Sequence, residues 1–123
     1  MVRTEGLTHI HLRVSDLGRS LAFYQQVFGL EEMFREGPNM VFLRTPGRRD
    51  TITLNQDPDQ DTARVGDSGG IAHFGFRLAE DADLELAIQE VRAAGGTLVG
   101  QGEHSPGEPY AYVTDPDGYV IEL

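Results

Sequence analysis

The last nine residues of the sequence are Asp115-Pro116-Asp117-Gly118-Tyr119-Val120-Ile121-Glu122-Leu123. Its first four residues predict a tight turn, because proline presets φ, aspartate bonds its own backbone and glycine accepts a positive φ. A short apolar strand follows, and Glu122 interrupts it. A carboxylate in such a strand is costly to bury unless a partner such as a metal ion compensates its charge. Glu122 is therefore the first candidate metal ligand.

The composition limits the classes of function. A chain of 123 residues is long enough for one domain with a real core, so we expect a single domain over residues 1–123. The formal charge of −10 argues against a nucleic-acid partner. The sequence has no apolar run of membrane-spanning length and no signal-peptide core, so we expect no membrane partner. Because cysteine is absent, any metal must use His, Asp, Glu or water, and a cytoplasmic location is expected.

The first half of the chain begins with an alternating strand over residues 7–14. His9, His11 and Arg13 share one face of this strand, and apolar residues share the other. Ser15 or Asp16 caps the helix that follows, whose apolar stripe ends before Gly29. Further strands are expected over residues 30–35, 40–44 and 51–54. Residues 56–70 show no periodicity and predict a linker or mobile loop.

The second half repeats the first half. A strand over residues 71–78 aligns with the first strand at an offset of 64 residues, which places His73 on His9. Asp81 or Asp83 caps a second helix, which ends at Gly95-Gly96. Short strands are expected over residues 97–99, 110–114 and 119–123. The closing strands of the two halves also match, and Thr53 falls on Glu122.

This repeat has a chemical consequence. Two similar modules packed about a pseudo-twofold axis place equivalent residues around that axis, so His9, His73 and Glu122 should converge. Thr53 is too weak a ligand to join them. Two histidines and one carboxylate leave coordination positions open for substrate and water, as in sites for Fe(II), Mn(II), Ni(II) or Zn(II). The sequence therefore predicts one divalent metal ion.

The chain resembles the vicinal oxygen chelate superfamily, which includes glyoxalase I, fosfomycin- and bleomycin-resistance proteins and extradiol dioxygenases. The resemblance implies an α+β fold of two βαβββ modules, about residues 5–56 and 70–123, that form a cup-shaped, mostly antiparallel eight-stranded sheet. It also implies a homodimer and places the family's metal ligands on His9, His73 and Glu122. Thr53 stands where glyoxalase I has a second glutamate, which argues against that activity. The matching segments are His9 to Leu17, Ser20 to Tyr24, Gly29-Leu30, His73 to Phe76 and Asp115 to Glu122.

These features favour a metal-dependent enzyme that acts on a small molecule chelating the ion through adjacent oxygens. Three reaction types are open: proton transfer next to a carbonyl, oxygen insertion into a catechol, and the opening of an epoxide by a thiol or water. The preferred interpretation is extradiol-dioxygenase-like or lyase/isomerase-like, and the sequence identifies no catalytic base. The alternative is a non-catalytic protein that binds a small molecule or sequesters an antibiotic, like the bleomycin-resistance members. A homodimer is expected because short modules leave sheet edges and apolar faces to cover.

Other polar residues have open roles. His11 shares the face of His9, so it either contacts substrate, supports the metal ligands or packs as a structural histidine. Thr53 and Tyr110 are further candidates for substrate contact, although Tyr110 equally suits a core or rim position. Glu103 and His104 fall in a predicted loop over residues 100–107. Such residues are solvated by default, although this loop could close over a substrate.

Overall fold

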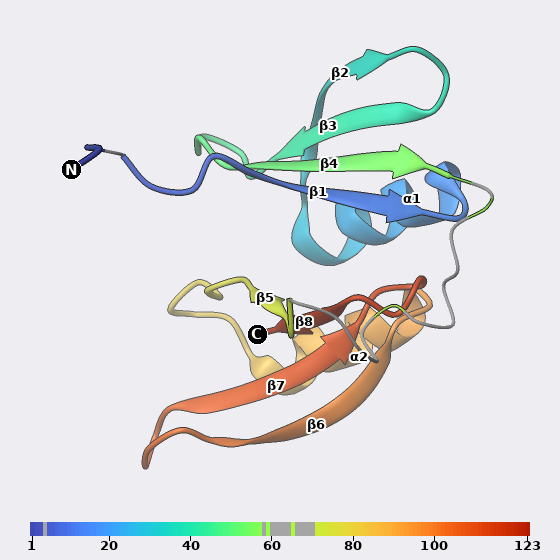
Figure 1. The fold of residues 1–123 in the computed structure, drawn as a ribbon. Helices are drawn as coiled ribbons and strands as arrows, with labels where there is room; N and C mark the ends of the chain where they lie inside the picture. The colour runs from blue at the N-terminus through green and yellow to red at the C-terminus, as the bar shows by residue number, and fades with distance from the viewer. Residues whose placement is uncertain (4, 58, 60–64, 66–70) are drawn as a thin grey trace.

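The structure is a computed structural model that describes residues 1–3, 5–57, 59, 65 and 71–123. The chain forms two modules with the same order of elements (Figure 1), which confirms the predicted α+β, two-module fold. The predicted linker over residues 56–70 lies largely outside the described residues. The first module contains β1 (His9–Val14), α1 (Leu17–Phe28), β2 (Glu31–Glu36), β3 (Met40–Arg44) and β4 (Thr51–Gln56). The second contains β5 (Phe74–Gly75), α2 (Leu84–Ala93), β6 (Thr97–Glu103), β7 (Pro109–Thr114) and β8 (Val120–Glu122).

Each module builds its own four-stranded sheet. The strand orders are β1-β4-β3-β2 and β5-β8-β7-β6. Among the strands that the structure describes, only the pairs β1–β4 and β5–β8 are parallel, so the sheets are mostly antiparallel, as predicted. These eight strands of one chain form two sheets of four, and not one continuous sheet. Among the described residues, β1 and β5 each pair on one side only, which leaves an open edge on each sheet.

The strand registers confirm the internal repeat. At the predicted offset of 64 residues, β1 and β5 are equivalent, and each pairs in parallel with the closing strand of its own module. Equivalent residues of the two modules have equivalent partners, so Thr53 and Glu122 occupy the same place in their sheets. The matched pairs are Ile10 with Ile52 and Phe74 with Ile121, then His11 with Thr53 and Gly75 with Glu122.

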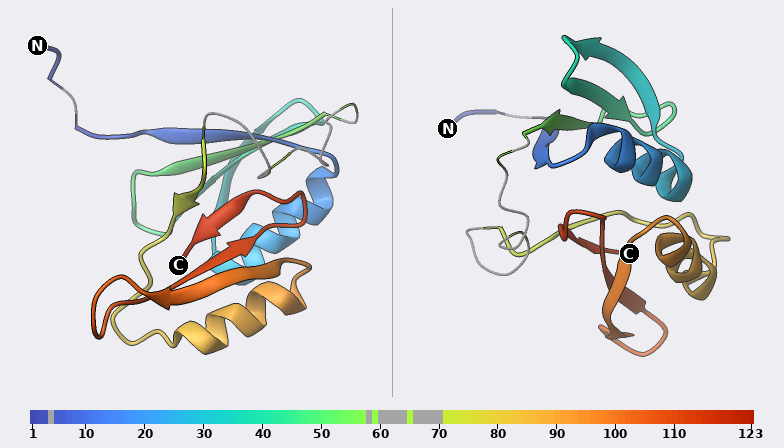
Figure 2. Two further views of the ribbon diagram at one scale, coloured as in Figure 1. Left: turned by 60° about the horizontal axis from the view of Figure 1, so that its bottom comes forward. Right: turned by 90° about the vertical axis from the view of Figure 1, so that its right-hand side faces the viewer.

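The helices begin and end at the residues that their sequence signals predict. Asp16 is the N-cap of α1, and its side chain accepts a hydrogen bond from the Arg19 N–H at 2.8 Å. Gly29 ends this helix with a φ of 63°, a conformation that glycine adopts without strain. Asp83, and not Asp81, caps α2. The two helices lie on the same side of the molecule (Figure 2). In the described part of the chain, neither helix is long and apolar enough to cross a membrane.

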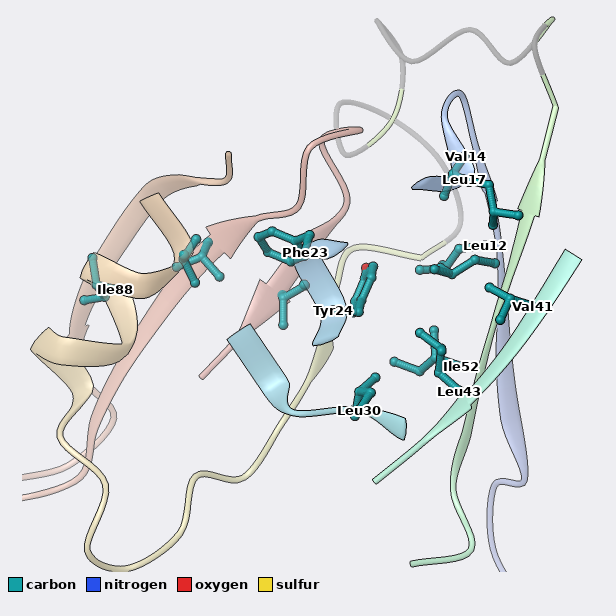
Figure 3. Close-up of a cluster of buried hydrophobic side chains, with 14 of the residues drawn as sticks. Leu12, Val14, Leu17, Phe23, Tyr24, Leu30, Val41, Leu43, Ile52 and Ile88 are labelled. Carbon is teal, nitrogen blue, oxygen red and sulfur yellow. The ribbon is translucent and has the colours of Figure 1, made fainter. Parts of the chain in front are cut away.

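Helix α1 lies between the two sheets and joins their cores (Figure 3). Phe23 points toward the second module, where it packs against Gly96. A Cβ atom built on Gly96 would lie 3.0 Å from the Phe23 ring and only 2.2 Å from the Thr114 carbonyl oxygen, so this contact requires glycine. The buried core residues of both modules form one cluster: Leu12, Val14, Leu17, Phe23, Tyr24, Leu30, Val41, Leu43, Ile52, Leu54, Ile88, Val91, Ala111, Val113 and Ile121.

Two strands of the second module, β5 and β6, differ most from their predicted lengths. β5 has two residues where the alternation over residues 71–78 predicts eight, because it pairs with β8 at only two positions and has no second partner among the described strands. β6 extends through residues that were predicted as a loop. Gly102 lies opposite Tyr110 there, and a Cβ at Gly102 would lie 2.9 Å from the Tyr110 hydroxyl oxygen. Glycine therefore marks a close approach of a ring here, and not the end of the strand.

The Asp-Pro-Asp-Gly turn is confirmed by its hydrogen bonds. The Asp115 carboxylate oxygen Oδ1 accepts hydrogen bonds from the backbone N–H groups of Asp117, Gly118 and Tyr119, at 2.9, 2.9 and 3.0 Å. Gly118 has a φ of 100°, as a turn glycine should. Oδ2 accepts the Tyr24 hydroxyl at 2.9 Å. Burial raises the pKa of Asp115 to about 6, while these hydrogen bonds oppose that rise.

The second aspartate of the turn reaches the start of α1. Asp117 Oδ1 accepts the Ser15 N–H at 3.0 Å, the Ser15 hydroxyl at 2.8 Å and the Arg19 guanidinium at 3.2 Å. Oδ2 accepts the Ser20 hydroxyl at 2.9 Å. We call Asp115, Asp117 and these α1-side partners the intermodule joint. It fastens the turn before β8 to the first module, and thereby fixes where β8 begins.

Candidate metal centre

Glu122 lies on the face of its sheet that the helices leave open. Along β7, Ala111 and Val113 are buried in the core, so Tyr110 and Tyr112 point to the opposite face. Glu122 is the register partner of Tyr112 and shares that face. Its side chain is 26% exposed, which leaves the carboxylate accessible to a small ligand.

Two imidazoles hold the Glu122 carboxylate. His73 Nε2 lies 3.0 Å from Oε2, and His104 Nε2 lies 2.6 Å from Oε1. The hydrogen bond from His104, and then the contact with His73, lowers the pKa of Glu122. Glu122 is therefore a carboxylate at neutral pH, and each of its oxygens faces a ring nitrogen.

Aromatic rings surround this carboxylate. The His104 ring stacks on Tyr110, with centroids 4.2 Å apart and planes at 20°. Tyr110 contacts Tyr112 edge to face at 5.2 Å, and His73 lies 5.0 Å from Tyr112. Desolvation, and then the nearby Glu122 charge, raises the pKa of the Tyr112 hydroxyl. A cavity of about 600 Å³ adjoins Glu122 and His104, so a ligand has room to reach the carboxylate.

The equivalent face of the first module carries His9. A second cavity, of about 340 Å³, is lined by His9, His11 and Thr53. Thr53 is 2% exposed, which suits a packed side chain better than a ligand. The Thr8 hydroxyl contacts His9 Nδ1 at 2.8 Å, so a metal bound to His9 would use Nε2. The wall of the cavity includes Met33 and two rings, Phe34 and Phe42, stacked 4.3 Å apart at 16°.

The structure thus brings together two of the three predicted ligands. His73 and Glu122 lie side by side, and their imidazole nitrogen and carboxylate oxygen are donors that divalent transition metals accept. His9 lines the cavity of the other sheet. Within the described residues of one chain, no three His, Cys, Asp or Glu side chains gather closely enough to hold a metal ion. One chain therefore places two of the predicted ligands on one sheet and the third on the other.

Sequence reasoning missed His104 and Tyr112 as neighbours of Glu122. The polar character of residues 100–107 concealed the continuation of β6 to Glu103. His104 does lie in the exposed turn after β6, as predicted, but the sequence did not show that this turn brings its ring to Glu122. A signal existed for Tyr112, because Tyr110 and Tyr112 stand two residues apart in a predicted strand and must share a face. Tyr110 itself, a predicted substrate contact, lies on the face of Glu122 and stacks on His104.

Comparison with known proteins places the chain in a family. Residues 6–123 match the model of the Glyoxalase/Bleomycin resistance protein/Dioxygenase superfamily. The chain is 34% identical to a lactoylglutathione lyase of Neisseria meningitidis over 95% of its own length and 88% of the lyase. It is 29% identical to a catechol-2,3-dioxygenase of Bacillus subtilis over 94% of its length, but it spans only 41% of that enzyme.

A solved structure shares the fold. A variant of the fosfomycin resistance protein FosX from Listeria monocytogenes, in complex with Mn(II), superposes with a TM-score of 0.77 at 24% identity, covering 98% of this chain and 90% of FosX. The match to the family model extends over nearly the whole chain and includes every predicted ligand. This protein therefore belongs to the Glyoxalase/Bleomycin resistance protein/Dioxygenase superfamily.

Proposed function

We propose that this protein is a metal-dependent enzyme that acts on a small molecule binding a divalent ion through two adjacent oxygens. The observation that carries the proposal is the pair formed by His73 and Glu122. Their donor atoms lie 3.0 Å apart on an open sheet face, next to a cavity of about 600 Å³. Catalytic and binding sites commonly combine a concave surface with a few convergent polar groups.

The metal site is completed between two copies of the chain. His9 of one copy joins His73 and Glu122 of a second copy, because one chain places these donors on different sheets. The open edges of β1 and β5 offer the surfaces along which two chains can meet. A homodimer of this kind also restores the predicted cup from one sheet of each chain. The expected cytoplasmic location stays a prediction.

The chain's own residues divide the work at this site. His73 and His9 bind through neutral imidazole nitrogens, and Glu122 adds one negative charge. A divalent ion bound there acts as a Lewis acid toward the substrate oxygens. Thr53 occupies the position of a second carboxylate but cannot accept a proton at neutral pH. A reaction that needs a strong base at this position is therefore disfavoured.

The cavity beside His9 favours a substrate with a ring. Phe34 is 52% exposed although it is a large apolar side chain, and it is stacked on Phe42 in the cavity wall. Aromatic pairs of this kind bind flat, apolar groups well. This observation, together with the name of the Bacillus relative, a catechol dioxygenase, favours a catechol-type substrate and a dioxygenase reaction. His11 and Tyr110 are then candidate contacts to the substrate. A lyase acting on a hemithioacetal is the second candidate, and the Neisseria relative favours it.

Metal titration at neutral pH tests the proposal. We expect the wild type to bind one Mn(II) per chain, His73→Ala to lose this binding, and the matched control Thr53→Ala to retain it. A wild type that binds no divalent ion after loading would instead support the alternative, a protein that sequesters a small molecule without a metal. A screen of catechols with oxygen, and of hemithioacetals without it, then separates the two reaction types.

A further inference from the structure

We propose that His104 is a positioning residue for Glu122: its Nε2 holds the carboxylate through Oε1 and leaves Oε2, beside His73, to face the metal. This inference rests on the proposed metal site and goes beyond it, because His104 is not one of the three predicted ligands. Each of the two histidines contacts a different oxygen of the Glu122 carboxylate. His104 Nε2 lies 2.6 Å from Oε1, and His73 Nε2 lies 3.0 Å from Oε2.

His104 is held in place before any ligand arrives. Its ring stacks on Tyr110 at 4.2 Å, and the close approach of Tyr110 to Gly102 fixes that tyrosine in turn. The backbone of the hairpin turn adds a second constraint. The His104 N–H donates to the Glu108 carbonyl at 3.1 Å, and the Glu108 N–H donates to the Ser105 carbonyl at 2.9 Å. An exposed ion pair between freely moving side chains contributes little. A ring fixed by stacking and by its backbone can orient a carboxylate with less loss of conformational freedom.

A carboxylate whose two oxygens have different partners is well suited to bind a metal ion. A carboxylate that binds a metal through one oxygen has a second oxygen that rotates unless a donor holds it. Groups that hydrogen-bond to metal ligands fix their orientation, and their removal typically weakens metal binding by roughly 10- to 100-fold. His104 is placed to do this for Glu122, because its Nε2 contacts Oε1, whereas Oε2 lies beside Nε2 of His73, which is itself a predicted ligand.

Two substitutions of His104 distinguish a role of its N–H group in orienting Glu122 from a purely structural role of its ring in the hairpin. His104→Phe keeps a ring on Tyr110 but has no N–H, whereas His104→Gln carries a side-chain N–H that can reach Oε1. Glu103→Gln, on the same hairpin, is the matched control. We expect Mn(II) affinity to fall about 10- to 100-fold in His104→Phe, and to stay near the wild-type value in His104→Gln and in the control. The unfolding midpoint of the metal-free protein should be the same in all four, since His104 is half exposed.

The outcomes distinguish the two proposals. If the wild type binds Mn(II) and His73→Ala does not, the metal site stands, and His104→Phe then decides the role of His104. Wild-type affinity in His104→Phe would overturn the positioning role, and so would tighter binding, which would show that His104 blocks the site. If His104→Gln is as weak as His104→Phe, His104 is itself a ligand and the positioning role is wrong. If the wild type binds no metal, the proposed function fails first.

Discussion

Three acidic residues within eight positions of the C-terminal stretch have opposite surroundings. Asp115 and Asp117 are buried, at 2% and 4% exposure, and their oxygens accept hydrogen bonds from backbone amides, hydroxyls and one guanidinium. Glu122 is partly exposed, and its oxygens face two imidazoles. The oxygens of the two aspartates accept hydrogen bonds from N–H and O–H groups, and several of these bonds link the two modules. Glu122 faces groups that can themselves bind a metal.

This difference separates a structural carboxylate from a functional one. A buried carboxylate needs a hydrogen-bond donor for each of its lone pairs. Once these bonds are made, it has no free lone pair with which to bind a ligand. A partly exposed carboxylate between histidines keeps lone pairs that an incoming cation can use. The intermodule joint therefore fixes the position of β8, and β8 presents Glu122 to the open face.

The largest stability loss is expected at the joint. Asp117→Ala should lower the free energy of unfolding by about 3 kcal/mol, because it leaves the buried Ser20 hydroxyl and the Ser15 groups without their acceptor. Chemical denaturation measures this change, and the exposed Asp81→Ala is the control. Equal stability of the two variants would show that the joint does not hold the modules together.

Glu122→Gln should give the opposite result. It keeps the shape of the side chain but removes its charge, so we expect Mn(II) affinity to fall more than about 100-fold while the unfolding midpoint of the metal-free protein hardly moves. Calorimetric titration and thermal unfolding measure the two effects on the same samples. A variant that unfolds early but still binds Mn(II) tightly would place Glu122 with the structural carboxylates.

The pH dependence of stability should isolate Asp115. Burial raises its pKa to about 6, above the ordinary value of 3.8, so folding favours its protonated form. Its stabilising contribution is complete below the ordinary value and is lost as the pH rises through about 6. Between about pH 4 and pH 7, we expect the wild type to lose about 2 kcal/mol relative to Asp115→Asn, which cannot ionise. Parallel pH profiles of the two proteins would contradict this.

The smallest effect is expected at the hydroxyl that meets Asp115. Tyr24→Phe keeps the buried ring but removes the donor to Oδ2, which should cost about 1 kcal/mol. The matched control is Tyr119→Phe. The Tyr119 hydroxyl of the wild type donates to the Arg13 carbonyl oxygen at 2.7 Å, in a more exposed place. Denaturation of both variants tests the order, and a greater loss in the control would reverse it.

The sequence was sufficient where a pattern is local or repeats. The alternation around His9 recurs around His73, so the two-module fold and the equivalence of β1 and β5 followed from it. Glu122 was found because a carboxylate stands out in an apolar strand. The joint could not be found in this way, because the α1-side partners of Asp115 and Asp117 lie 91 to 102 residues earlier in the chain. The residues of the Asp-Pro-Asp-Gly turn explain the conformation of the turn, but they do not show that it binds to the start of α1.

His104 illustrates a second limit. Its segment is rich in glycine and polar residues, which is typical of a loop, yet Gly100 and Gly102 lie within β6 opposite tyrosines. Only the packing of those rings shows why glycine belongs in the strand. The division of the predicted ligands between two sheets was equally hidden, because a repeat makes residues equivalent without showing whether they meet in one chain or between two.

Mixing two defective variants tests the shared site most directly. His9→Ala and Glu122→Gln should each lose Mn(II) binding, but a mixed dimer would contain one intact site, made by His9 of one chain with His73 and Glu122 of the other. After the two variants are unfolded and refolded together in equal amounts, we predict that about one quarter of the wild-type binding returns, because half of the dimers are mixed and each holds one of two sites. No recovery from a mixture that sedimentation shows to contain dimers would contradict a site shared between two chains.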